Sequence, residues 1–108
     1  MRRLKVGYQT YSFQAHSPEE LDGVSGDCDC DAGIIRYDAS EEGLRHANTL
    51  LHECLHALWD QMVEGFDEEV EERIVAALSN GLTMLLVDNP EIKLTVHGES
   101  VFGTSGSI

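Results

Sequence analysis

Two histidines and a glutamate lie together in an H-E-x-x-H motif, as His52, Glu53 and His56. The run from Thr49 to Asp60 that contains them has no proline or glycine and is predicted to be helical. In a helix, residues four positions apart lie on one face, so both imidazoles can reach the same metal ion. Glu53 is then close enough to deprotonate a water on that metal. The motif predicts a Zn²⁺ site with His52 and His56 as ligands and Glu53 as the catalytic general base.

A catalytic zinc ion usually has three protein ligands, so the motif leaves one ligand to be found. The position at which a longer version of the motif places a third histidine is Met62, which excludes that version. A carboxylate from a second helix is expected instead, out of the acidic run at residues 68–72. Glu71 is the predicted third metal ligand, because apolar residues at +3, +4 and +7 place it at the end of a buried stripe. Glu72 and then Glu68 stay open as alternatives.

Two long helices are predicted to carry these residues. The first runs from about Glu41 to about Val63, and the second from about Glu68 to Val87, where Asp88 precedes Asn-Pro. Each helix has apolar residues at helical spacing, which predicts a buried stripe. In the first helix these residues are Leu44, Ala47, Leu51, Leu55, Leu58 and Met62. In the second they are Ile74, Val75, Leu78, Leu82, Leu85 and Leu86.

The sequence before the helices predicts a small sheet. The segment from Leu4 to Phe13 is rich in aromatic and β-branched residues and is expected to form one strand. Residues 27–31 and 34–37 are predicted to form a hairpin that turns near residues 31–33.

The predicted fold class is therefore α+β, with a small, mainly antiparallel sheet of about three strands packed on two long helices. An additional edge strand is expected from alternating apolar residues at 92–96. Residues 1–97 are predicted to form a single domain, and residues 98–108 a flexible Gly/Ser-rich tail.

The net charge of −13 over 108 residues narrows the range of partners. A chain with this much negative charge repels the phosphates of nucleic acids, which are therefore not expected partners. A neutral peptide or a basic protein is an expected partner. No apolar run approaches the length of a membrane span, and Met1-Arg2-Arg3 is not followed by the apolar region of a signal peptide. We expect a cytoplasmic protein with three reduced cysteines and no association with membranes. The sequence predicts no oligomeric state.

Two other patterns have simpler interpretations. The acids from Asp27 to Asp38 partly follow the spacing of a calcium loop, but Ala32 occupies the position that requires glycine, so a solvated acidic hairpin is expected. Cys28 and Cys30 could hold a soft metal, but no second cysteine pair completes such a site, so free thiols are predicted.

Three segments together resemble small phage- and prophage-encoded H-E-x-x-H proteins related to the ImmA/IrrE and SprT-like metallopeptidases. They are residues 33–38, the motif helix at 49–60, and residues 71–78 leading to Asp88-Asn89-Pro90. The resemblance implies a minimal, gluzincin-like zincin of a bacterial host's cytoplasm. It also implies zinc-dependent hydrolysis of a protein or peptide substrate, with His52, His56 and Glu71 as ligands and Glu53 as the base. The alternative function is a non-catalytic, zinc-containing protein-binding module of phage or prophage origin.

Overall fold

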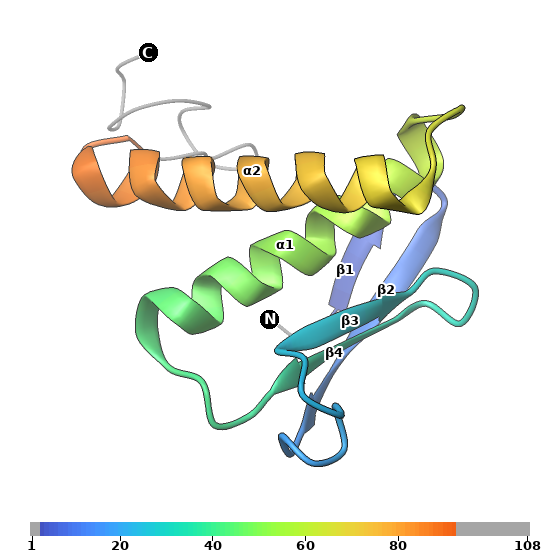
Figure 1. The fold of residues 1–108 in the computed structure, drawn as a ribbon, viewed down its shortest axis with the longest axis horizontal. Helices are drawn as coiled ribbons and strands as arrows, with labels where there is room; N and C mark the ends of the chain where they lie inside the picture. Colours follow the sequence, from blue (N-terminus) through green and yellow to red (C-terminus); the bar gives the residue numbers. More distant parts are fainter. Residues whose placement is uncertain (1–2, 93–108) are drawn as a thin grey trace.

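The computed structural model describes residues 3–92, which form a four-stranded sheet followed by two long helices (Figure 1). This is an α+β arrangement, as the sequence predicts. The elements are β1 (Arg3–Val6), β2 (Gln9–His16), β3 (Gly26–Asp29), β4 (Ile34–Asp38), α1 (Gly43–Met62) and α2 (Glu68–Asp88).

The sheet has the strand order β1-β2-β4-β3 and is mixed. The β1–β2 and β3–β4 pairs are antiparallel, and β2 and β4 are parallel. Two of the three pairs are antiparallel, in line with the predicted mainly antiparallel sheet, but the described sheet has four strands where about three were predicted, because the segment expected to form one strand is a tight hairpin. It turns at Gly7, whose φ of +58° is a left-handed conformation that glycine adopts at no steric cost.

The predicted hairpin of β3 and β4 is confirmed, and it turns between Asp29 and Ile34. Because β4 pairs with both β2 and β3, β3 lies at the edge of the described sheet. This arrangement brings the edge strand beside α1, whose packing partners in the sheet are β3 and β4.

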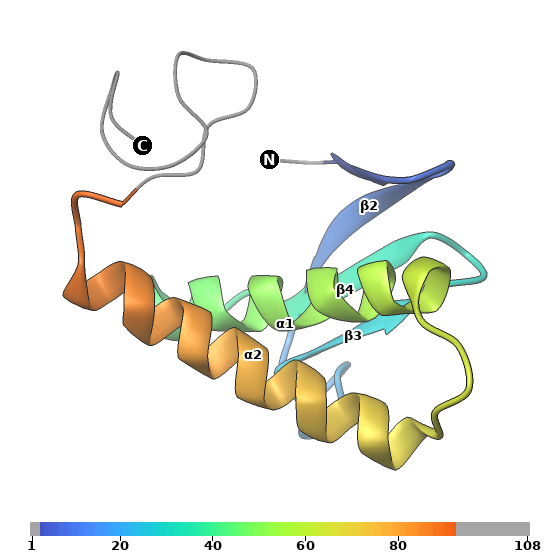
Figure 2. The same cartoon turned by 90° about the horizontal axis from the view of Figure 1, so that it is seen from above.

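The molecule has three layers, with α1 between the sheet and α2 (Figures 1 and 2). Side chains that alternate along the strands pack against α1, so Val6, Tyr11 and Ile35 are buried together with Ala57. Among the described elements α2 packs on α1 and does not contact the sheet extensively. Neither helix combines the length and the uninterrupted apolar run needed to cross a membrane.

The helix boundaries agree with prediction to within two residues, but the face of α1 that is buried does not. The residues buried on α1 are Thr49, Glu53 and Ala57, which recur every four positions. Leu44 and Met62, from the predicted apolar stripe, are 60% and 65% exposed. Two polar residues therefore occupy the side of the helix that packs on the sheet.

Ile35 is fully buried at the centre of this core, which makes it a test of the fold. Replacing Ile35 by alanine should lower the free energy of unfolding by about 3 kcal/mol, because it removes buried methyl groups and leaves a cavity. Denaturant unfolding followed by circular dichroism measures this difference. The matched control is Val24→Ala, since Val24 is 51% exposed and should change stability little. Equal effects at the two positions would contradict the described core.

Two predictions concern residues that the structure does not describe. The edge strand predicted at residues 92–96 begins with Ile92, which is not part of a strand, and its remaining residues lie outside the described range. The predicted Gly/Ser-rich tail at residues 98–108 also lies outside that range.

Candidate metal centre

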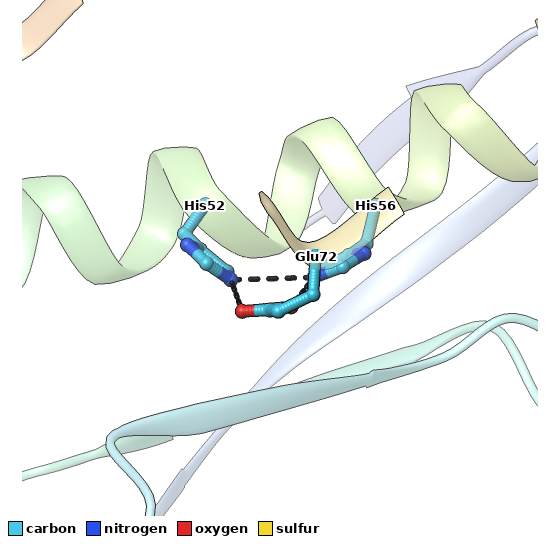
Figure 3. A group of neighbouring side chains, drawn as sticks. All are labelled: His52, His56 and Glu72. Atoms are coloured by element: carbon cyan, nitrogen blue, oxygen red, sulfur yellow. Dashed lines mark hydrogen bonds and ion pairs between the residues drawn. The ribbon is translucent and has the colours of Figure 1, made fainter. Parts of the chain in front are cut away.

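His52 and His56 point toward the same place from successive turns of α1 (Figure 3). Their Nε2 atoms are 3.2 Å apart, and the ring centroids are separated by 4.9 Å. The spacing of four residues in an unbroken helix produces this pairing, as the motif predicts.

Glu72 of α2 brings a carboxylate to both histidines (Figure 3). One of its oxygens, Oε1, is 2.9 Å from Nε2 of His52, and the other, Oε2, is 2.8 Å from Nε2 of His56. The position of Glu72 depends on where α2 begins, and Asp67 defines that start by accepting a hydrogen bond from the backbone N–H of Val70. His52, His56 and Glu72 form the group of potential metal ligands found in the described part of the chain.

The Nδ1 atom of each imidazole, which points away from the shared point, has its own partner on α2. Nδ1 of His56 is 2.7 Å from a carboxylate oxygen of Glu71, which can only accept, so this nitrogen carries the proton. Nδ1 of His52 is 3.4 Å from Oγ of Ser79, whose hydroxyl donates to the carbonyl of Ala76. Ser79 therefore accepts from His52. With Nδ1 as the donor, each histidine in its neutral form would present an Nε2 lone pair to a metal at the common point, as metal-ligating histidines do.

The ligand atoms of these three residues lie close enough together to surround one metal ion. Zn–N and Zn–O bonds of about 2.1 Å in a tetrahedral arrangement place neighbouring ligand atoms about 3.4 Å apart. The measured separations of 2.8–3.2 Å are slightly shorter. Hydrogen bonds account for the same arrangement, because an N–H on each Nε2 can donate to its own oxygen of Glu72.

Glu53 lies beside this group and is buried, with 6% of its surface exposed. Burial raises the pKa of Glu53 to about 7, since the carboxylate loses hydration, and the neighbouring His56 only partly opposes this effect. A carboxylate with such a pKa accepts and returns protons near neutral pH. The pKa of His56 is raised as well: burial lowers it, but Glu71, Glu53 and Glu72 outweigh that effect.

Gly26 allows the edge strand β3 to approach this part of α1 closely. A Cβ at this position would lie 2.7 Å from the carbonyl oxygen of Arg36 and 3.5 Å from Cγ of Glu53. A side chain here would clash with the backbone of β4 and press on Thr49 of α1, at 3.1 Å from its Cγ2, so β3 would have to move.

Two adjoining clefts reach the metal-ligand group from solvent. One, of about 660 Å³, is lined by His52, Glu53 and His56 on α1 and by Gly26 and Cys28 on β3. The other, of about 920 Å³, continues past His56 along the acidic β3–β4 hairpin. Both are lined by Glu72, whose side chain is 56% exposed. An ion bound by these three residues would therefore keep a side open to solvent.

The acidic candidates on α2 occupy three different positions. Glu72, the first of the two open alternatives, lies at the Nε2 atoms, while Glu71 contacts the far side of the His56 ring. Glu68 lines the larger cleft. The reason is that Val75 and Ser79 face α1, whereas Ile74, on which the prediction depends, is 38% exposed. One helical turn before Val75, the face of α2 that packs on α1 therefore passes between Glu71 and Glu72.

Ser79 is a residue of the site that the sequence analysis misses. It is completely buried on α2, with its hydroxyl next to His52. Its signal in the sequence is a serine four residues after Val75, on the face of the helix that the apolar pattern assigns to the core. From the sequence, only apolar packing is predicted for the buried face of α2.

The remaining predicted polar features lie apart from the metal-ligand group. Asp27 is paired with Arg36, whose guanidinium lowers the pKa of that carboxyl, and Asp29 accepts from the backbone N–H of Ala32. The thiols of Cys28 and Cys30 are free and 3.7 Å apart. The acidic hairpin thus supplies charge to the larger cleft, and its carboxylates do not converge on one point.

Comparison with known proteins adds no family to this geometry. No protein-family model matches the chain, and searches of curated proteins and of solved structures also found no match. The functional argument therefore rests on the positions of the side chains themselves.

Replacing Ser79 by alanine should weaken zinc binding by about 10- to 100-fold, because the Nδ1–H of His52 then has no partner that fixes the ring. Zinc affinity can be measured by competition with a chromogenic chelator, and circular dichroism shows whether α2 is retained. Ser40→Ala is the control, since Ser40 is exposed and its hydroxyl contacts Asp38. Unchanged affinity in the Ser79 variant would show that this hydroxyl does not orient His52.

Proposed function

We propose that this protein is a zinc-dependent metallopeptidase that hydrolyses peptide bonds, with His52, His56 and Glu72 as metal ligands. The observation that carries the proposal is the convergence of these three side chains at 2.8–3.2 Å, with each Nδ1 hydrogen-bonded away from the site. In this assignment Glu71 orients His56 and is not itself a ligand. The fold would then be a minimal zincin.

Zinc bound at this place would polarise a substrate carbonyl and activate water. The protein's own contribution is positional. Glu53 follows His52 directly on α1, so its carboxylate can take a proton from the attacking water and deliver it to the leaving amine. The burial that raises its pKa suits both steps, because the group must be protonated in one and ionised in the other.

An extended peptide is the substrate shape that best suits the surroundings of the site. Strand β3 lies at the edge of the described sheet and lines both clefts, so a substrate strand could pair with its free edge. Such pairing would carry a peptide bond past Glu53 and His56. It also explains why β3 must approach α1 closely at Gly26.

Removal of metal tests the proposal directly. Protein purified without chelators should contain about one zinc per chain and cleave an unfolded substrate such as casein. Dialysis against a strong chelator should abolish cleavage, and stoichiometric zinc should restore it. The control is a His52→Ala/His56→Ala double variant, which should neither bind zinc nor regain activity.

The outcomes of this experiment separate two functions. Zinc that is bound without cleavage of casein or of a peptide library would support the non-catalytic, protein-binding alternative. Cleavage that survives complete removal of metal, or that persists in the double variant, would overturn the metallopeptidase proposal.

A further inference from the structure

Two thiols lie side by side in the wall that the two clefts share. Cys28, on β3, and Cys30, just after this strand, are both free, and their Sγ atoms are 3.7 Å apart. Side chains two positions apart along an extended chain lie on the same face, which explains how the two sulfurs come together. Both residues line the smaller cleft and the larger one, so an ion that enters either cleft can reach them.

The neighbouring strands hold this pair of thiols in place. Cys28 is opposite Ile35 in the β3–β4 pairing, and its side chain packs against the buried core. The carbonyl of Cys30 accepts a hydrogen bond of 2.7 Å from Nε2 of Gln9 on β2. Because the fold itself fixes both residues, the two sulfurs are already close together before any ligand binds.

The two sulfurs are close enough to bind one metal ion together. Bonds of about 2.3 Å from a metal to two thiolates separate the sulfurs by about 3.8 Å at a tetrahedral angle and by about 4.6 Å in a linear arrangement. The observed 3.7 Å is at the lower end of this range. Small rotations of the two side chains would therefore be enough to admit an ion.

The number of ligands distinguishes between metals. In the described part of the chain, no third side chain brings a ligand atom close to both sulfurs. Zinc usually takes four ligands, so two thiolates alone hold it poorly. Monovalent copper, Cu⁺, is a soft ion that prefers thiolates, and two of them are enough to bind it. The pair of cysteines therefore suits Cu⁺ better than zinc.

A buried hydroxyl beside the thiols lacks a partner that a metal-bound thiolate would provide. Tyr11 is completely buried, and its hydroxyl has no hydrogen-bond partner among residues 3–92. Burial raises the pKa of Tyr11, and the neighbouring thiol of Cys30 raises it further. Metal binding would convert Cys30 to a thiolate, which is a strong acceptor, and the Tyr11 hydroxyl could then donate to it.

We propose that Cys28 and Cys30 form a binding site for one Cu⁺ ion, held between two thiolates in the shared wall of the clefts. Each thiol releases its proton to solvent and its sulfur bonds to the copper, so two protons leave for each ion bound and neither sulfur is oxidised. The site does not depend on the proposed peptidase function, because it uses none of the ligands of the candidate zinc centre.

Anaerobic titration with Cu⁺ in competition with a chromogenic cuprous chelator tests the proposal on the full chain. The His52→Ala/His56→Ala double variant should bind one Cu⁺ per chain, which makes the result independent of the candidate zinc centre. In this background, Cys28→Ser and Cys30→Ser should each weaken binding by about 100-fold or more, because each removes one of two ligands. Cys54→Ser is the matched control, since this third thiol is also half-buried but should not bind the ion.

X-ray absorption spectroscopy of the copper-loaded double variant identifies the ligands. It should show two sulfur neighbours around copper and no nitrogen. Circular dichroism shows whether each variant is folded, and Cys30→Ser tests the site even if Cys28→Ser unfolds the protein, because Cys30 is not packed against the core. Nitrogen ligands, unchanged affinity in Cys30→Ser, or an equal loss of affinity in Cys54→Ser would overturn the proposal.

Discussion

Replacement of Glu53 by glutamine should reduce peptide hydrolysis by about 10²- to 10⁴-fold while leaving the zinc content unchanged. Glutamine has nearly the same shape but cannot accept the proton of the attacking water. His52, His56 and Glu72 make no hydrogen bond to Glu53 among the described contacts, so the metal-ligand group should remain intact. Initial rates on casein, together with metal analysis of the same samples, measure both quantities.

A control for this variant lies on the surface of α2. Glu69 is exposed in the first turn, so Glu69→Gln makes the same change of charge away from the site. It should retain the parent rate and the parent zinc content. Cleavage by Glu53→Gln at the rate of the control would mean that Glu53 is not the general base, even if the protein binds zinc.

The second large effect is expected from a pair of neighbouring substitutions, Glu72→Gln and Glu71→Gln. Loss of the Glu72 carboxylate removes a proposed metal ligand and should weaken zinc binding by more than about 100-fold. Loss of the Glu71 carboxylate removes the partner of Nδ1 of His56 and should weaken it by only about 10- to 100-fold. Competition with a chromogenic chelator ranks the two variants on one scale.

The order of these two effects decides between the sequence-based and the structure-based assignments. A larger loss for Glu71→Gln would return Glu71 to the role of third ligand that the sequence predicts. Equal and small losses would remove both acids from the metal site. Circular dichroism of both variants shows whether α2 is still folded, since the two residues occupy its first turns.

The sequence predicts the two helices and the pairing of His52 with His56 well, because these depend on local chemistry. His52 and His56 need only an unbroken helix to face the same point. The side chain of Asp67 accepts a hydrogen bond from the backbone N–H of Val70 at the start of α2. An aspartate at this position is a common helix N-cap, so the sequence indicates this contact too. The outcome is that α1 and α2 begin and end within two residues of the predicted positions.

The faces of the helices could not be predicted in this way. Apolar periodicity assigns the leucines of α1 to the core, but Thr49 and Glu53 are the buried residues on the side facing the sheet. The same inversion occurs on α2, where Ser79 is buried and Leu78 is 49% exposed. Both helices turn polar side chains inward here, and this reverses the pattern on which the prediction depends.

The sheet was misjudged for a different reason. The segment from Leu4 to Phe13 contains a left-handed turn at Gly7, which divides it into two strands. The parallel pairing of β2 with β4 then follows from the long connection through residues 17–25, and no local pattern reports it. Long-range pairing also determines that β3 lies at the edge, next to the candidate site.

The packing of α2 affects how well the protein resists proteolysis. This helix packs on α1 among the described elements, and it brings Glu72 toward Glu53, where like charges repel. A divalent cation would neutralise that repulsion and act as a clasp between the two helices. The zinc concentration would then set the free energy needed to separate α2 from α1. It would therefore also set the rate at which proteases digest the chain.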